Sequence, residues 1–120
     1  MIYYIYILEC TNNAYYTGYT TDMERRYQEH VNGSSKCKYT RSFPPRTIVA
    51  CWKLSLELSH TLKIERLIKA LPKNKKQQII LEPSLLLAML KKQGYSKEIL
   101  DEIDYICPTY NTDEPFGAIV

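Results

Sequence analysis

Two segments near the amino end of the chain have the pattern of β-strands. Residues 2–8 read Ile-Tyr-Tyr-Ile-Tyr-Ile-Leu, and residues 15–20 are again rich in tyrosine and threonine, the aromatic and β-branched types that favour strands. Asn12-Asn13 lies between them and is typical of a tight turn. The pattern therefore predicts a β-hairpin.

A helix and a third strand are predicted after this hairpin. Thr21 and Glu24 have the spacing of a capping box, which predicts a helix from that point to about Gly33. Residues 34–45 contain three serines and Pro44-Pro45, which indicate a loop. A strand pattern resumes over residues 47–52.

The second half of the chain has helical periodicity. Leucines and isoleucines recur at helical spacing over residues 56–71, and Pro72 closes that helix or opens the next. An apolar run follows Pro83 and ends at Gly94. Ser96 begins a segment in which Ile99, Leu100, Ile103 and Ile106 fit another helix, and the tail beyond Pro108 is expected to be irregular.

These elements predict an α/β fold in which helices flank a small, three-stranded, mainly antiparallel sheet, with a helical C-terminal extension. A chain of 120 residues suits one compact core. We expect residues 1–81 to form the main domain and residues 82–120 to form the extension, packed on or beside it.

Composition places the chain among globular proteins, since 45% of its residues are hydrophobic and 24% are charged. The longest uninterrupted apolar stretch without tyrosine, Leu85 to Leu90, is far below the roughly 18 residues that a membrane span requires. The chain does not open with a basic and then apolar signal peptide. We expect a cytoplasmic protein with no membrane partner. The four cysteines form no CxxC pair, which favours reduced, packed thiols over a zinc site or disulfides.

Charge is distributed unevenly along the chain. Residues 1–80 contain 13 lysines and arginines and 6 acidic residues, whereas residues 81–120 contain 3 basic and 7 acidic residues. Eight of the 11 tyrosines lie in the first third. A basic, tyrosine-rich segment favours contact with a polyanion. On charge alone, an ordinary solvated lysine-rich surface explains the pattern equally well.

One carboxylate is unusual because it interrupts an apolar helical stripe. Glu65 falls between Leu62 and Ile68 on the predicted helix over residues 56–71. Burying an ionised carboxylate is costly unless it is paired or binds a metal. From the residues alone, a salt bridge with Lys69 at i+4 is the favoured explanation, and a metal site is the alternative.

A second candidate group lies on the first predicted helix. Arg26 and His30 are four residues apart and share a face with Met23 and Tyr27, so both can point at one place on the sheet and hold a phosphate there. The alternative is that they are two solvated side chains beside the packed face. Tyr6 alternates with aliphatic residues on the first strand, which places its hydroxyl on one face of the sheet.

The order of these residues resembles the GIY-YIG nuclease superfamily, and in particular its small single-domain bacterial members. The similar segments are Tyr-Ile-Tyr-Ile-Leu-Glu-Cys from residue 4, Tyr-Tyr-Thr-Gly-Tyr-Thr-Thr-Asp-Met-Glu-Arg-Arg from residue 15, Lys38-Tyr39-Thr40-Arg41, and Lys63-Ile64-Glu65-Arg66. The resemblance covers about residues 1–80.

The resemblance implies a role for each of five residues. Tyr6 matches the tyrosine that acts as general base toward the attacking water, and Tyr16 matches one that orients water or phosphate. Arg26 matches the catalytic arginine, and His30 a position held by histidine or tyrosine. Glu65 matches the glutamate that binds the divalent metal, Mg²⁺ or Mn²⁺. Because an ordinary tyrosine has a pKa of about 10, Tyr6 is expected to need Arg26 and a metal to lower it.

The implied activity is metal-dependent endonucleolytic hydrolysis of phosphodiester bonds in DNA, in repair or recombination. The alternatives are a nucleic-acid-binding module of the same fold that cleaves poorly or not at all, and a protein-interaction domain that uses the acidic C-terminal segment. We expect DNA to lie on basic and aromatic side chains from two segments, namely Lys36, Lys38, Tyr39, Arg41, Lys69, Lys73, Lys75 and Lys76.

Overall fold

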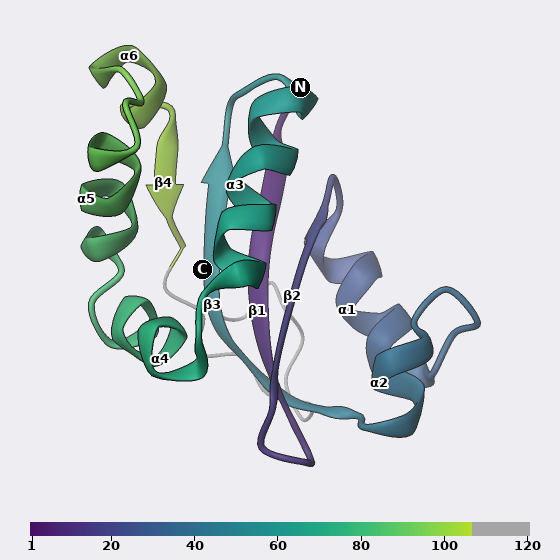
Figure 1. The fold of residues 1–120 in the computed structure, drawn as a ribbon. Coiled ribbons are helices and arrows are strands. Elements are labelled where there is room, and N and C mark those ends of the chain that lie inside the picture. Colours follow the sequence, from purple (N-terminus) through teal and green to yellow (C-terminus); the bar gives the residue numbers. More distant parts are fainter. Residues whose placement is uncertain (107–120) are drawn as a thin grey trace.

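The computed structural model describes residues 1–106, which form a four-stranded antiparallel sheet flanked by helices (Figure 1). The strand order is β2-β1-β3-β4. In chain order the elements are β1 (Tyr3–Cys10), β2 (Tyr15–Thr20), α1 (Met23–Asn32), α2 (Lys38–Ser42), β3 (Pro45–Leu54), α3 (Leu58–Ala70), α4 (Lys73–Leu81), α5 (Ser84–Lys92), α6 (Lys97–Leu100) and β4 (Ile103–Tyr105). The predicted α/β class and the antiparallel sheet are confirmed.

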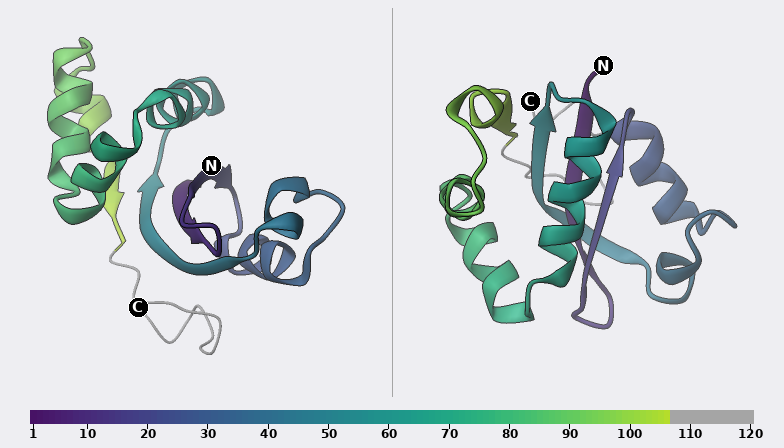
Figure 2. Two further views of the ribbon diagram at one scale, coloured as in Figure 1. Left: turned by 60° about the horizontal axis from the view of Figure 1, so that its bottom comes forward. Right: turned by 45° about the horizontal axis from the view of Figure 1, so that its top comes forward.

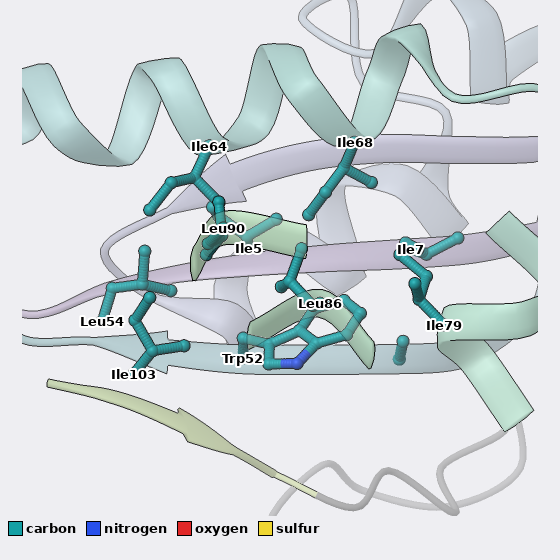
Figure 3. Close-up of a cluster of buried hydrophobic side chains, with 11 residues drawn as sticks. Ile5, Ile7, Trp52, Leu54, Ile64, Ile68, Ile79, Leu86, Leu90 and Ile103 are labelled. Carbon is teal, nitrogen blue, oxygen red and sulfur yellow. The ribbon is translucent and has the colours of Figure 1, made fainter. Parts of the chain in front are cut away.

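The alternation of side chains along β1 divides the molecule into two cores. Ile5 and Ile7 belong to a buried cluster with Ile64 and Ile68 of α3 (Figure 3). Tyr6 and Leu8 face the other way and pack with Met23 and Tyr27 of α1. The buried members of this second cluster are Tyr6, Leu8, Cys10, Met23, Tyr27, Ile48 and Cys51. Because successive strand side chains point to opposite faces, α3 and α1 cover opposite faces of β1.

The predicted hairpin and first helix are confirmed, with one change at the helix start. Asn13 has φ 67°, a left-handed conformation that suits the turn between β1 and β2. Asp22 is the N-cap of α1, and its carboxylate accepts a hydrogen bond from the Arg25 amide at 3.0 Å. The expected capping box beginning at Thr21 is therefore wrong by one residue. Gly33 ends the helix with φ 70°.

Two further expectations about local structure are wrong. The expected loop over residues 34–45 contains the short helix α2. The expected helix beyond Ser96 ends at Leu100, and Ile103–Tyr105 forms the fourth strand. This strand pairs with Trp52–Leu54 of β3, so it satisfies backbone groups that an edge strand would leave open.

Residues after position 81 complete the core around β1. Leu86 and Leu90 of α5 and Ile103 of β4 belong to the same buried cluster as Ile5 and Ile7 (Figure 3). The last two helices stand beside β4, as the two views in Figure 2 show. The expected division at residue 81 stays a prediction about domain organisation, and the expected irregular tail beyond Pro108 lies outside the described residues.

Other features of the described residues agree with the composition. Cys10, Cys37 and Cys51 are buried free thiols. Within residues 1–106, none of the helices has the length and hydropathy needed to cross a membrane.

Candidate active site

Four of the five predicted site residues meet on the face of the sheet that α1 covers. Tyr6 comes from β1, Tyr16 from the paired strand β2, and Arg26 and His30 from α1. The Tyr6 hydroxyl lies 2.7 Å from His30 Nε2, and Arg26 Nε donates to the same oxygen at 3.4 Å. The Tyr16 ring lies 5.1 Å from the His30 ring, between centroids. Two strands and one helix therefore bring these four side chains into contact.

A glycine makes room for this arrangement. Gly18 pairs with Tyr6 across the two strands. A Cβ atom at Gly18 would lie 2.5 Å from the Tyr6 hydroxyl oxygen and 2.7 Å from its Cζ. Because the Tyr6 ring is fully buried and cannot swing into solvent to relieve this contact, glycine is the residue that fits opposite it.

The hydrogen bonds continue from His30 into α2. His30 Nδ1 lies 2.7 Å from Thr40 Oγ1, and the Thr40 hydroxyl donates to the Cys37 carbonyl oxygen at 3.3 Å. His30 is 1% exposed and Thr40 is 0% exposed, so solvent does not compete for these contacts. Thr40 lies in one of the segments that resemble the GIY-YIG superfamily, and the resemblance implies no role for it.

Two opposing effects act on the ionisation of Tyr6. Burial raises the Tyr6 pKa well above its ordinary value of 10, and the hydrogen bond from Arg26 opposes this shift without overcoming it. Arg26 thus lowers the Tyr6 pKa, as expected, but desolvation is the larger effect and the net shift in the protein alone is upward. Tyr6 is a neutral phenol at pH 7 and can donate a hydrogen bond.

The ionisation of His30 complements that of Tyr6. Burial, followed by the positive charge of Arg26, lowers the His30 pKa from 6.5 to about 4. His30 is therefore neutral at pH 7, and one of its ring nitrogens can accept the Tyr6 hydrogen.

This low pKa predicts a pH-dependent stability. The unfolded chain binds a proton at His30 between pH 6.5 and about 4 and the folded protein does not, so His30 favours folding above pH 6.5 and this contribution is lost as the pH falls. At 1.36 kcal/mol for each unit by which the folded and unfolded pKa values differ, the free energy of unfolding falls by about 3 kcal/mol. Denaturant unfolding at pH 7 and pH 4 measures it. We expect His30→Gln to flatten the profile and His60→Gln, at the other histidine, to preserve it; equal slopes in both variants would contradict the assignment.

The fifth residue, Glu65, lies on α3 and is 6% exposed. Its carboxylate lies 3.4 Å from Lys69 Nζ, which is the i+4 salt bridge that the sequence favoured. Neighbouring Ile64 and Ile68 pack on the face of β1 opposite Tyr6. The structure therefore groups four predicted residues by direct contacts and places Glu65 on the helix that covers the other face.

A single carboxylate defines what kind of metal Glu65 could hold. Residues 1–106 contain no group of three or more His, Cys, Asp or Glu side chains that could enclose an ion. Mg²⁺ commonly keeps several waters and binds through one or two carboxylates together with substrate phosphates. One buried carboxylate at Glu65 fits that mode and does not fit a fully protein-enclosed ion.

The two predicted basic segments approach the tip of the β1–β2 hairpin from opposite sides (Figure 1). Asn12 Nδ2 donates to the hydroxyl of Tyr39, a residue of α2, at 3.0 Å. Lys73 Nζ donates to the Asn13 carbonyl oxygen at 2.8 Å and lies over the Tyr15 ring. The remaining basic residues are exposed apart from half-buried Lys76, namely Lys36, Lys38, Arg41, Lys69 and Lys75. Positive charge therefore flanks the hairpin tip.

Aromatic rings connect this tip to the site. Tyr39 stacks on Tyr16 with ring centroids 5.8 Å apart, and Phe43 lies 5.4 Å beyond Tyr39. Tyr39 is 37% exposed and Phe43 41% exposed, so both offer ring surface to a ligand. The stacking position of Phe43 was missed by sequence reasoning, which assigned that segment to a loop.

The fold and this residue cluster define a known class of protein domain. Residues 2–78 match the family model described as the GIY-YIG catalytic domain, and the chain belongs to the GIY-YIG family. The resemblance found from the sequence is thereby confirmed.

Within that family the chain is similar to a set of small proteins. The UPF0213 protein BH0048 of Halalkalibacterium halodurans is 40% identical over 80 residues, covering 67% of this chain and 83% of the relative. A UPF0213 protein of Syntrophus aciditrophicus is 42% identical over 77 residues, covering 64% and 87%. A solution NMR structure of UPF0213 protein BH0048 from Bacillus halodurans has a TM-score of 0.43 at 38% identity and covers 67% and 83% of the two chains.

Proposed function

We propose that this protein is a divalent-metal-dependent endonuclease that hydrolyses phosphodiester bonds in DNA. The observation that carries the proposal is the buried contact between Tyr6 and neutral His30, with Arg26 on the same hydroxyl oxygen. Membership of the GIY-YIG family supports a nuclease-type activity. A cytoplasmic role in DNA repair or recombination is part of the proposal.

Arg26 is the residue proposed to bind the scissile phosphate. Its side chain is 21% exposed and pairs with Glu29 at 3.2 Å, on the surface of α1. A phosphate oxygen would replace Glu29 as the partner of the guanidinium, whose planar donors match phosphate geometry. The same charge would stabilise the additional negative charge that develops on the phosphate in the transition state.

Tyr6 and His30 are proposed to remove a proton from the attacking water. The Tyr6 oxygen takes the water proton while the phenol hydrogen passes to His30 Nε2, so that no free phenolate has to form beforehand. The water oxygen forms a bond to phosphorus, and the bond from phosphorus to the leaving oxygen breaks. The leaving oxygen takes a proton from solvent. Since the Tyr6 hydroxyl is sealed by its neighbours, Arg26 has to shift toward the phosphate to open it.

Glu65 is the residue proposed to hold Mg²⁺ or Mn²⁺. A bound divalent ion would supply positive charge to the phosphate and to the leaving oxygen. In the structure Lys69 forms a salt bridge with the Glu65 carboxylate. Its half-exposed ammonium can move into solvent or onto a DNA phosphate. In this proposal, the salt bridge and the metal site are alternative states of the same carboxylate.

The surface around the hairpin tip is proposed to bind the DNA backbone. Lys38 and Arg41 lie next to Tyr39 on one side, and Lys73 contacts the hairpin on the other. Burial, followed by the positive charge of nearby Lys69, lowers the Lys76 pKa, and a bound anion would offset the repulsion from Lys69. The acidic end of α6 and the start of β4 lie at the other end of the sheet (Figure 1).

This surface predicts a particular response to salt. We expect Lys38→Gln with Lys75→Gln to weaken DNA binding similarly for all sequences and to reduce the slope of log affinity against log salt by about 1 to 2, since phosphate contacts release counterions. Fluorescence anisotropy with a chelator measures binding without cleavage. Lys91→Gln with Lys97→Gln is the matched control at the acidic end of the chain and should keep the slope. Equal losses in both pairs would contradict this surface.

One observation favours the alternative, a binding module that cleaves weakly. The Tyr6 side chain is 0% exposed, so a water molecule does not reach its hydroxyl in this conformation. The deciding experiment incubates the protein with end-labelled single-stranded, duplex and flap DNA, and with RNA, in Mg²⁺, Mn²⁺ or chelator. Metal-dependent products support the endonuclease, and binding without products supports the alternative.

A further inference from the structure

We propose that Thr40, buried in α2, is a positioning residue that determines which ring nitrogen of His30 carries hydrogen, and thereby the direction in which Tyr6 can give up its proton. The catalytic consequence rests on the function proposed above. The effect on the histidine tautomer does not depend on that function and can be measured separately.

The direction of each hydrogen bond follows from Thr40. A hydroxyl has one hydrogen to donate and lone pairs to accept. The Thr40 hydrogen is used on the Cys37 carbonyl oxygen, 3.3 Å away and three residues earlier in the chain, a local contact typical of threonine in helices. The Thr40 oxygen is left as an acceptor 2.7 Å from His30 Nδ1. In this arrangement Nδ1 carries the hydrogen.

The state of Nδ1 determines the state of Nε2. Neutral imidazole has one hydrogen on its two nitrogens, so His30 Nε2 is left with a lone pair, 2.7 Å from the Tyr6 hydroxyl. Tyr6 then donates to Nε2 and accepts from Arg26. Each group in this series of hydrogen bonds, from Arg26 to the Cys37 carbonyl, then donates to the next group.

The opposite tautomer would disable the proposed relay. Hydrogen on Nε2 would point at the Tyr6 oxygen, which already accepts from Arg26, and the Tyr6 hydrogen would lose its acceptor. His30 could not then receive that hydrogen. Since His30 and Thr40 are closed to solvent, water cannot replace Thr40 at Nδ1, and the threonine oxygen determines the choice.

The tautomer can be read from the ¹⁵N shifts of the imidazole nitrogens. The chain has two histidines, so His60→Gln assigns the remaining signals to His30. We expect pyrrole-like Nδ1 and pyridine-like Nε2 in the wild-type protein at pH 7. Thr40→Val keeps the side-chain shape and removes the acceptor, so hydrogen should move partly or fully to Nε2. Thr40→Ser keeps the hydroxyl and should keep the wild-type tautomer.

Cleavage rates extend the same comparison. Thr40→Val is expected to reduce kcat about 10- to 100-fold with little change in KM, the scale seen when an orienting group behind a reacting side chain is lost. Thr40→Ser should restore most of the rate. If Thr40 were needed only for packing, valine, which keeps the shape of threonine, would be tolerated better than serine, which lacks the methyl group. The opposite order of rates therefore indicates that the hydroxyl is required.

Three results would overturn the proposal: hydrogen on Nε2 in the wild-type protein, an unchanged tautomer in Thr40→Val, or Thr40→Ser as impaired as Thr40→Val. If Thr40→Val does not fold, the wild-type spectrum and Thr40→Ser still decide. A wild-type protein that cleaves no substrate would refute the proposed function, whereas the spectra would still test the role of Thr40.

Discussion

Glu65→Gln is expected to abolish metal-dependent cleavage and to leave the fold and most DNA binding intact. Glutamine keeps the volume of this 6%-exposed side chain but not its charge, so the metal loses its protein ligand. The cost in stability should be small, because glutamine also removes the buried charge and the Lys69 ammonium that loses its partner is 51% exposed to water. Cleavage assays, thermal unfolding and Mn²⁺-induced NMR line broadening measure the three effects.

Glu57→Gln is the matched control for this prediction. Glu57 lies at the start of the same helix, is exposed, and makes no side-chain capping bond, so the same change there should affect neither cleavage nor Mn²⁺ broadening. An active Glu65→Gln protein would refute the metal assignment. An unfolded one would show that the salt bridge to Lys69 is the main role of Glu65.

The site was predictable from sequence wherever local spacing fixes geometry. Arg26 and His30 share a helix face because they are four residues apart, and Tyr6 faces them because β1 alternates. Thr40 could not be found in this way, because its role depends on α2 packing against α1 across a segment that reads as a loop. No local pattern marks the short helix, and its position is a tertiary property.

The fourth strand shows a conflict between periodicity and tertiary structure. Ile99, Ile103 and Ile106 have helical spacing, but Ile103 and Tyr105 also fit the period of two that a strand requires. The open edge of β3 at Trp52–Leu54 decides between these readings, because pairing satisfies its backbone groups. Short segments of this kind take the structure that their neighbours stabilise.

The basic surface was predictable in composition but not in arrangement. Sequence separates Lys38 and Lys73 by 35 positions, and nothing in either segment indicates that both approach Asn12 and Asn13. The hydrogen bonds at the hairpin tip make the connection, from Asn12 to Tyr39 and from Lys73 to Asn13. The turn at Asn12 and Asn13, for which the sequence predicts only a chain reversal, thus brings two charged segments together.

Tyr6→Phe and Arg26→Ala are each expected to slow cleavage about 100-fold or more, the effect typical of losing a general base or a positioned charge. Phenylalanine keeps the buried ring of Tyr6 and removes the atom that contacts both His30 and Arg26. The rate of single-turnover cleavage, at a protein concentration high enough to bind all of the substrate, measures the chemical step. Tyr4→Phe, on the same strand face and half-buried, and Arg25→Ala, on exposed α1 surface, are the matched controls and should cleave at close to the wild-type rate.

Arg26→Lys separates charge from geometry at the same position. A lysine ammonium restores the charge but cannot present two parallel donors to a phosphate, and it cannot occupy both the Tyr6 oxygen and the Glu29 carboxylate as the Arg26 guanidinium does. We therefore expect lysine to recover little of the rate lost in Arg26→Ala. Full recovery would show that charge alone suffices. If the Tyr6→Phe variant cleaved at the wild-type rate, the Tyr6 hydroxyl would be excluded as the base. The proton of the attacking water would then have to leave without the relay through Tyr6 and His30.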